Sequence, residues 1–80
     1  NTLTVSLADK LHNARAIVTD LLISGPSTWD RFNSSPEEIL WYYNQVLSTG
    51  RAKQGNTFLL TNLAEAIGEM TRLHEQSSQS

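Results

Sequence analysis

Polar side chains that could take part in chemistry gather in one segment of the chain, from Asp9 to Asp20. Asp9, His12 and Asn13 lie three and four residues apart, a spacing that places them on one flank of a helix. A carboxylate and an imidazole on the same flank could bind a divalent metal ion, and a carboxylate could also accept a proton. Two ligands are fewer than a working metal site usually has, so we favour the alternative: a solvated carboxylate at Asp9 and a partly buried His12 bonded to a backbone carbonyl.

The rest of the sequence gives no support for several other kinds of catalysis. The chain contains no cysteine, and its second histidine, His74, lies far along the sequence near the end of the last expected helix. No serine nucleophile has a histidine close to it in the sequence, and no glycine-rich loop precedes a helix as it would in a phosphate-binding loop. Thiol catalysis, a serine–histidine pair and a P-loop are therefore not indicated.

Three stretches with helical spacing of apolar residues must position these side chains. The first covers residues 4–23 and ends at the turn Ser24–Ser27, where glycine can adopt a left-handed conformation and proline cannot continue the helix. We expect its apolar face to consist of Leu7, Leu11, Ala14, Val18, Leu21 and Leu22. A short amphipathic piece around Trp29–Phe32, of about one helical turn, then anchors the connection to the core.

The second stretch begins at the most specific local signal in the chain. Ser35 is a helix N-cap, proline follows at the first helical position, and Glu38 completes a capping box. Apolar residues at helical spacing continue to Ser48–Gly50, where we expect the helix to stop: Ile39, Tyr42, Tyr43, Val46 and Leu47. After a polar loop over residues 51–56, a third helix begins at Thr57 or Phe58 and carries Leu60, Leu63, Ala64, Ile67, Met70 and Leu73 or His74.

Short connections between consecutive helices imply antiparallel neighbours, so the expected fold is all-α, with three main helices in a hairpin-like stack. The aromatic residues should supply much of the core: Trp29, Phe32, Tyr42 and Tyr43. Trp41 falls off the apolar face of its helix, so we expect it to cover a neighbouring element or a subunit interface. Gly68, inside the third helix, suggests close backbone approach of another helix.

Length and composition limit the function classes. Eighty residues, 39% of them hydrophobic, form a single domain, which we place at residues 1–75 with a frayed tail at 76–80. The net charge of -2 and the scattered lysines and arginines disfavour nucleic-acid binding. No apolar run approaches the roughly 20 residues that span a bilayer. Without cysteines or an export signal, a cytoplasmic location and no membrane partner are expected.

The segment Ser6–Arg15 resembles the last metal-binding motif of HD-domain phosphohydrolases, in particular the branch that hydrolyses the guanosine polyphosphate alarmones (ppGpp) to release pyrophosphate. The similarity continues through Gly25, residues 29–33 and residues 38–43, so it covers about residues 4–50. It implies a partial HD-domain bundle and a divalent cofactor, commonly manganese. It also implies that Asp9 is a metal ligand and that Asn13, with Lys10 and Arg15, borders a nucleotide pocket.

In that family a histidine and a His-Asp pair, both upstream of the motif, complete the metal site. No His-Asp pair occurs in these eighty residues, so we expect no catalysis and no bound metal in this chain alone. One expectation is therefore that this chain is the C-terminal part of an HD-domain phosphohydrolase. By itself it would act as a self-associating helical module, with Trp41 at an interface. The alternative is a part of an active pyrophosphohydrolase whose partner is the set of upstream HD helices.

Overall fold

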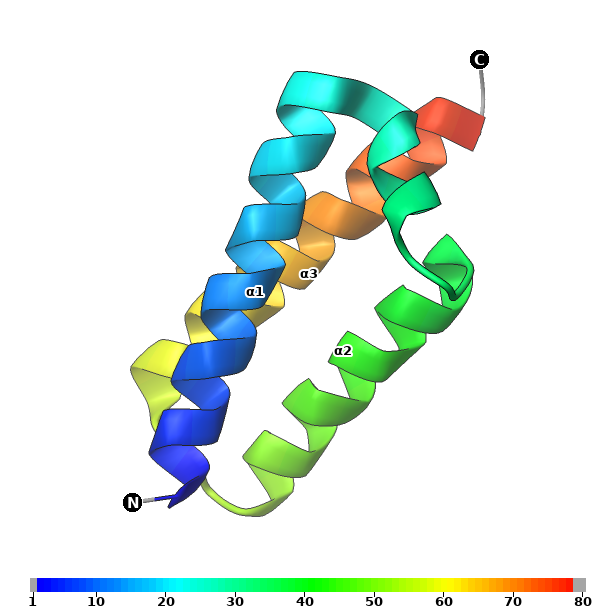
Figure 1. Ribbon diagram of the computed structural model, residues 1–80. Helices are drawn as coiled ribbons and strands as arrows, with labels where there is room; N and C mark the ends of the chain where they lie inside the picture. Colours follow the sequence, from blue (N-terminus) through cyan, green and yellow to red (C-terminus); the bar gives the residue numbers. More distant parts are fainter. Residues whose placement is uncertain (1, 79–80) are drawn as a thin grey trace.

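The computed structural model describes residues 2–78, and all of its regular elements are helices. They are α1 (Thr2–Ser24), the 3₁₀ helix η1 (Gly25–Arg31), α2 (Pro36–Ala52) and α3 (Thr57–Ser78). Figure 1 shows that α2 runs opposite to α1 and that α3 runs opposite to α2. Within the described range there is no strand, so the expected all-α, three-helix fold is confirmed.

The third helix holds the molecule together, because it packs against both α1 and α2 whereas α1 and α2 have few contacts with each other. Leu63 and Met70 on α3 are the largest apolar side chains that are completely buried. The weak direct packing of α1 on α2 leaves a groove between these two helices, in which two of the crevices described below lie. The core consists of Leu7, Leu11, Ala14, Ile17, Leu21, Trp29, Ile39, Tyr43, Leu47, Leu60, Leu63, Ala66, Ile67 and Met70.

The first helix ends as predicted, but its apolar face is turned slightly from the predicted one. Gly25 has a φ of +69°, the left-handed conformation expected at the end of a helix. Ile17 is buried, whereas Leu22 is 64% exposed, so the prediction that Leu22 belongs to the core is wrong. The following turn and the amphipathic piece form one continuous element, η1, in which Thr28 and Trp29 are buried.

The second helix starts at the predicted capping box and continues past the predicted end. The Ser35 hydroxyl accepts a hydrogen bond from the Glu38 amide, and the Glu38 side chain accepts one from the Ser35 amide. The helix does not stop at Gly50 but runs to Ala52, because Gly50 is helical and buried and its missing side chain makes room for leucines of α1 and α3. The left-handed residue that ends α2 is Gln54, with a φ of 56°.

The third helix begins at Thr57, one of the two predicted starts, and the Asn56 side chain caps it by accepting a hydrogen bond from the Leu59 amide. It continues to Ser78, so the first part of the expected tail, residues 76–78, is helical. Residues 79–80 of that tail lie outside the described residues.

Two expectations about particular side chains are wrong. Gly68 is exposed, and a Cβ atom added to it would meet nothing within 4 Å, so no helix approaches closely there. Tyr42 is 44% exposed rather than part of the core, although Trp29 and Tyr43 are buried and Phe32 is partly buried as expected. None of the described helices is long and apolar enough to cross a membrane.

Candidate functional site

The structure separates the three residues that were predicted to border a nucleotide pocket. Asn13 lies at a crevice between α1, η1 and α2; Lys10 lies at a second crevice between α1 and α2; and Arg15 lies at a third, between α1 and α3. Lys10 and Arg15 are five residues apart, which turns their side chains to different flanks of α1. The three side chains therefore do not converge on one ligand.

The crevice at Asn13, called the Asn13 crevice below, has a volume of about 460 Å³. Its walls combine a side-chain amide, a guanidinium group and two aromatic rings, which together could bind a planar polar ligand. Arg31 forms an ion pair with Asp20 across the crevice. The lining residues are Asn13, Ala16, Ile17, Asp20, Arg31, Phe32 and Tyr43.

Tyr43 is the buried member of this crevice, with only 7% of its surface exposed. Burial is the largest cause that raises the pKa of its hydroxyl above the usual value, and the nearby Lys10 partly opposes that rise. The hydroxyl therefore stays protonated at neutral pH, where it can donate or accept a hydrogen bond.

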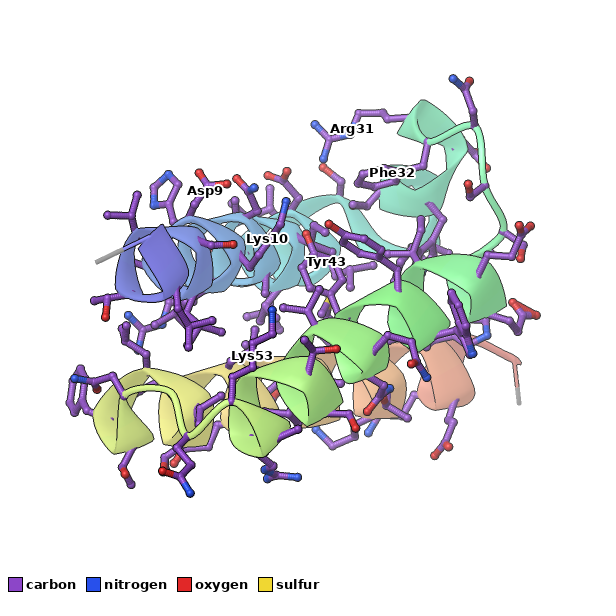
Figure 2. All side chains as sticks on the ribbon, turned by 90° about the horizontal axis from the view of Figure 1, so that it is seen from below. Asp9, Lys10, Arg31, Phe32, Tyr43 and Lys53 are labelled. Carbon is purple, nitrogen blue, oxygen red and sulfur yellow. The ribbon has the colours of Figure 1, made fainter. Side chains whose placement is uncertain are left out.

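The crevice at Lys10, called the lysine crevice below, lies beside the N-terminal part of α1 and the C-terminal part of α2. Figure 2 shows Lys10 on α1 and Lys53, the residue that directly follows α2, on the side of the molecule where these two helices border each other. The Lys10 ammonium nitrogen lies 5.6 Å from the centre of the Tyr42 ring. A hydrogen bond with Tyr42 is the largest cause that raises the pKa of Lys10, so this group remains a cation at neutral pH.

Arg15 and Asp20, on either flank of α1, have partners within the molecule. The Arg15 guanidinium donates a hydrogen bond of 2.7 Å to the side-chain oxygen of Asn62 on α3. Asp20 accepts from Arg31 of η1. Both contacts join α1 to a neighbouring element, which gives these two side chains a structural role.

Asp9 and His12 are exposed on α1, and Figure 2 shows Asp9 on the side of this helix that points away from α2. The expectation of a partly buried His12 is therefore wrong. Among residues 2–78, no group of three or more carboxylate, imidazole or thiol side chains is close enough together to hold a metal ion. Asp9 and His12 alone do not fit a manganese-type site, because such a site needs several fixed ligands.

A further crevice, of about 530 Å³, lies at the other end of the bundle beside Trp29 and His74. The two rings meet edge to face with their centres 5.8 Å apart, and the His74 Nε2 atom lies 3.6 Å from a carboxylate oxygen of Glu37. The second histidine thus helps to join α3 to η1 and α2. It lies on a different element from Asp9, which does not line this crevice.

Sequence reasoning missed Arg31 and Tyr43 as members of the Asn13 crevice. Arg31 follows a glycine and a proline in a short element whose direction the sequence does not specify, and Tyr43 was assigned to the core alone. The signal that could have found them is the dense run of polar and aromatic residues over 28–33, beside a helix that carries Asn13. Comparisons of the chain with protein-family models, curated proteins and solved structures returned no match.

Proposed function

We propose that this chain is the C-terminal helical part of an HD-type phosphohydrolase and that the Asn13 crevice receives the nucleotide substrate. The observation that supports this is the position of Asn13. It lies four residues after Asp9 on one flank of α1, and it lines a crevice that also contains Arg31 and Tyr43. An amide and a guanidinium group can bind the edge of a purine base or a phosphate, and a phenol can pack against the base.

The proposed function is binding, not catalysis by this chain alone. One carboxylate and one imidazole on consecutive turns of an exposed helix bind a divalent ion only weakly, so a complete metal centre needs ligands from outside these eighty residues. The expected result with manganese and guanosine tetraphosphate is no release of pyrophosphate above the uncatalysed rate. Release that depends on both the metal and Asp9 would contradict this part of the proposal.

Nuclear magnetic resonance titration with guanosine tetraphosphate tests the binding site. We expect signals from the Asn13 crevice to shift in a saturable way. Asn13→Ala should weaken binding about five- to tenfold, the effect of losing one hydrogen bond to a charged ligand. Asn44→Ala is the matched control, because Asn44 is an exposed amide on α2 that bonds to the Leu40 carbonyl and does not line the crevice. An equal effect of both variants would contradict the assignment.

A second proposal concerns the same chain as a separate unit: we propose that it self-associates through the outer face of α1. Val5 and Ile23 are 69% and 77% exposed, and they lie on the side of α1 opposite to the core. Large apolar side chains exposed at both ends of this face are typical of contact with more protein, and the face between them carries Asp9 and His12. Trp41, which is 65% exposed on α2, was predicted to be an interface residue and offers a different surface.

Light scattering over a range of protein concentrations tests this second proposal. We expect the unmodified chain to form dimers or larger species and the double variant Val5→Ser/Ile23→Ser to be monomeric. Trp41→Ser is the control that separates the two surfaces, and we expect it to associate like the unmodified chain. A chain that stays monomeric at high concentration would contradict self-association, whatever the variants do.

A further inference from the structure

The four crevices described above differ in the charge of their walls. The crevice beside Trp29 and His74 includes Asp30, the Asn13 crevice includes Asp20, and the crevice at Arg15 includes Glu65 and Glu69. The lysine crevice has no carboxylate among its lining residues, and it has two ammonium groups in a chain whose net charge is -2. Its lining residues are Leu3, Ser6, Leu7, Lys10, Tyr42, Gln45, Val46, Thr49, Gly50 and Lys53.

The two lysines of this crevice are not used in ion pairs. Within residues 2–78, Arg31 and Arg72 pair with a carboxylate and the His74 imidazole lies beside Glu37, whereas neither Lys10 nor Lys53 has a carboxylate within 4.0 Å. The Lys10 residue is partly buried, and its solvent-exposed ammonium group lies 5.6 Å from the centre of the Tyr42 ring. A positioned cation beside a second cation attracts an anion, because the field of both groups adds in the crevice.

Neutral hydrogen-bond donors complete the wall. Ser6 of α1 and Thr49 of α2 supply hydroxyl groups, and Gln45 of α2 supplies an amide. The crevice has a volume of about 310 Å³, which is enough for a phosphoryl group and part of the molecule that carries it. A dianion with several acceptor oxygens matches two ammonium groups and three neutral donors better than a monoanion does.

We propose that the lysine crevice is a binding site for a phosphoryl group, held by Lys10 of α1 and by Lys53, which directly follows α2. It is separate from the Asn13 crevice, whose lining residues it does not share, so it does not depend on the function proposed above. The favourable interaction of a cation with the negative C-terminal end of the α2 dipole does not by itself explain the presence of a lysine at position 53. Arg51 already places a cation in the last turn of that helix, and Arg51 does not line the crevice.

Titration of the full chain with inorganic phosphate at constant ionic strength, followed by nuclear magnetic resonance, tests this site. We expect saturable shifts of the amide signals of Ser6, Gln45 and Thr49, with a dissociation constant of about the millimolar range, because exposed ammonium groups are screened by solvent and salt. Lys10→Gln and Lys53→Gln should each weaken binding about fivefold or more. Arg51→Gln is the matched control, since it removes the same charge two residues away from Lys53, and it should change affinity less than about twofold.

Comparison ligands identify the anion and its source. Glycerol 3-phosphate should bind as well as inorganic phosphate if the site takes phosphate esters, and much more weakly if it takes only the free ion; either result supports a phosphoryl site. Acetate, a monoanion, should bind less tightly than phosphate, and equal or tighter binding of acetate would overturn the phosphoryl assignment. An Arg51→Gln effect as large as that of the lysine variants, or shifts that grow linearly with phosphate, would show nonspecific attraction and overturn the proposal. The saturable shifts should occur at Ser6, Gln45 and Thr49 and not at Ala16 or Ile17, which line the Asn13 crevice, and this pattern distinguishes the two sites.

Discussion

Gln54 ends α2 in a conformation that L-amino acids adopt only at a cost. Its φ is 56°, its amide donates to the Arg51 carbonyl, and the next amide, of Gly55, donates to the Gly50 carbonyl. This is the Schellman arrangement, in which glycine is the preferred left-handed residue. We expect Gln54→Gly to stabilise the protein by about 1 kcal/mol, because glycine removes the steric cost of the left-handed conformation. Urea unfolding of both proteins measures the difference, and a loss of stability would contradict the assigned end of α2.

The Tyr43 hydroxyl should make stability depend on pH in the alkaline range. Burial raises its pKa in the folded chain, so above the usual tyrosine pKa of about 10 the unfolded chain loses this proton first. The folded chain then binds more protons than the unfolded chain, and stability must fall as pH rises, by at most about 1.4 kcal/mol per pH unit for one proton. Unfolding in urea between pH 8 and pH 11 should show a smaller decline for Tyr43→Phe. An identical decline would assign the effect to other groups, including Lys10, whose pKa is also raised.

The helices show which parts of the structure follow from local sequence. Ser35, Pro36 and Glu38 predict the start of α2 because the N-cap interactions are all made within four residues. The predicted end of α2 is wrong because glycine can either adopt a left-handed conformation or allow close packing within a helix, and the local sequence does not distinguish these two roles. Gly25 supplies a left-handed φ, whereas Gly50 stays helical and its Cβ position would lie 2.7 Å from a Leu60 methyl carbon. That second use depends on another helix, which the local pattern does not contain.

Two glycines inside helices should respond differently to substitution. An added Cβ at Gly68 on α3 meets open space, so Gly68→Ala should stabilise the protein by about 1 kcal/mol through helix propensity alone. The same change at Gly50 on α2 must displace methyl groups of Leu60 and Leu7, so it should give less stabilisation or a net loss. Thermal or urea unfolding of the two variants measures the contrast. An equal gain at both positions would contradict the close packing of α1 and α3 on Gly50.

At the scale of the whole molecule, the candidate site follows from how α1 and α2 are arranged around α3. Periodicity predicted that Asp9 and Asn13 share a flank of the first helix, and it predicted most of the core. It could not predict which crevice each side chain borders, because that depends on α2 lying apart from α1 while both pack on α3. The separation of Lys10 from Asn13, and the entry of Arg31 into the Asn13 crevice, are consequences of this tertiary arrangement.

The central position of α3 makes the stability of the whole molecule sensitive to its buried face. Leu63 has no exposed surface, and replacing it by alanine should cost about 2–5 kcal/mol. A domain of this length has a total stability of about 4–12 kcal/mol, so Leu63→Ala should remove a large share of it and lower the unfolding temperature markedly. Leu22→Ala is the matched control, because this leucine is 64% exposed on α1 and its truncation should change stability by less than about 0.5 kcal/mol. Circular dichroism during heating measures the stability of both variants. A loss of stability of similar size in both would mean that Leu22 is covered in solution. Self-association through α1 would have this effect if the interface extended to Leu22.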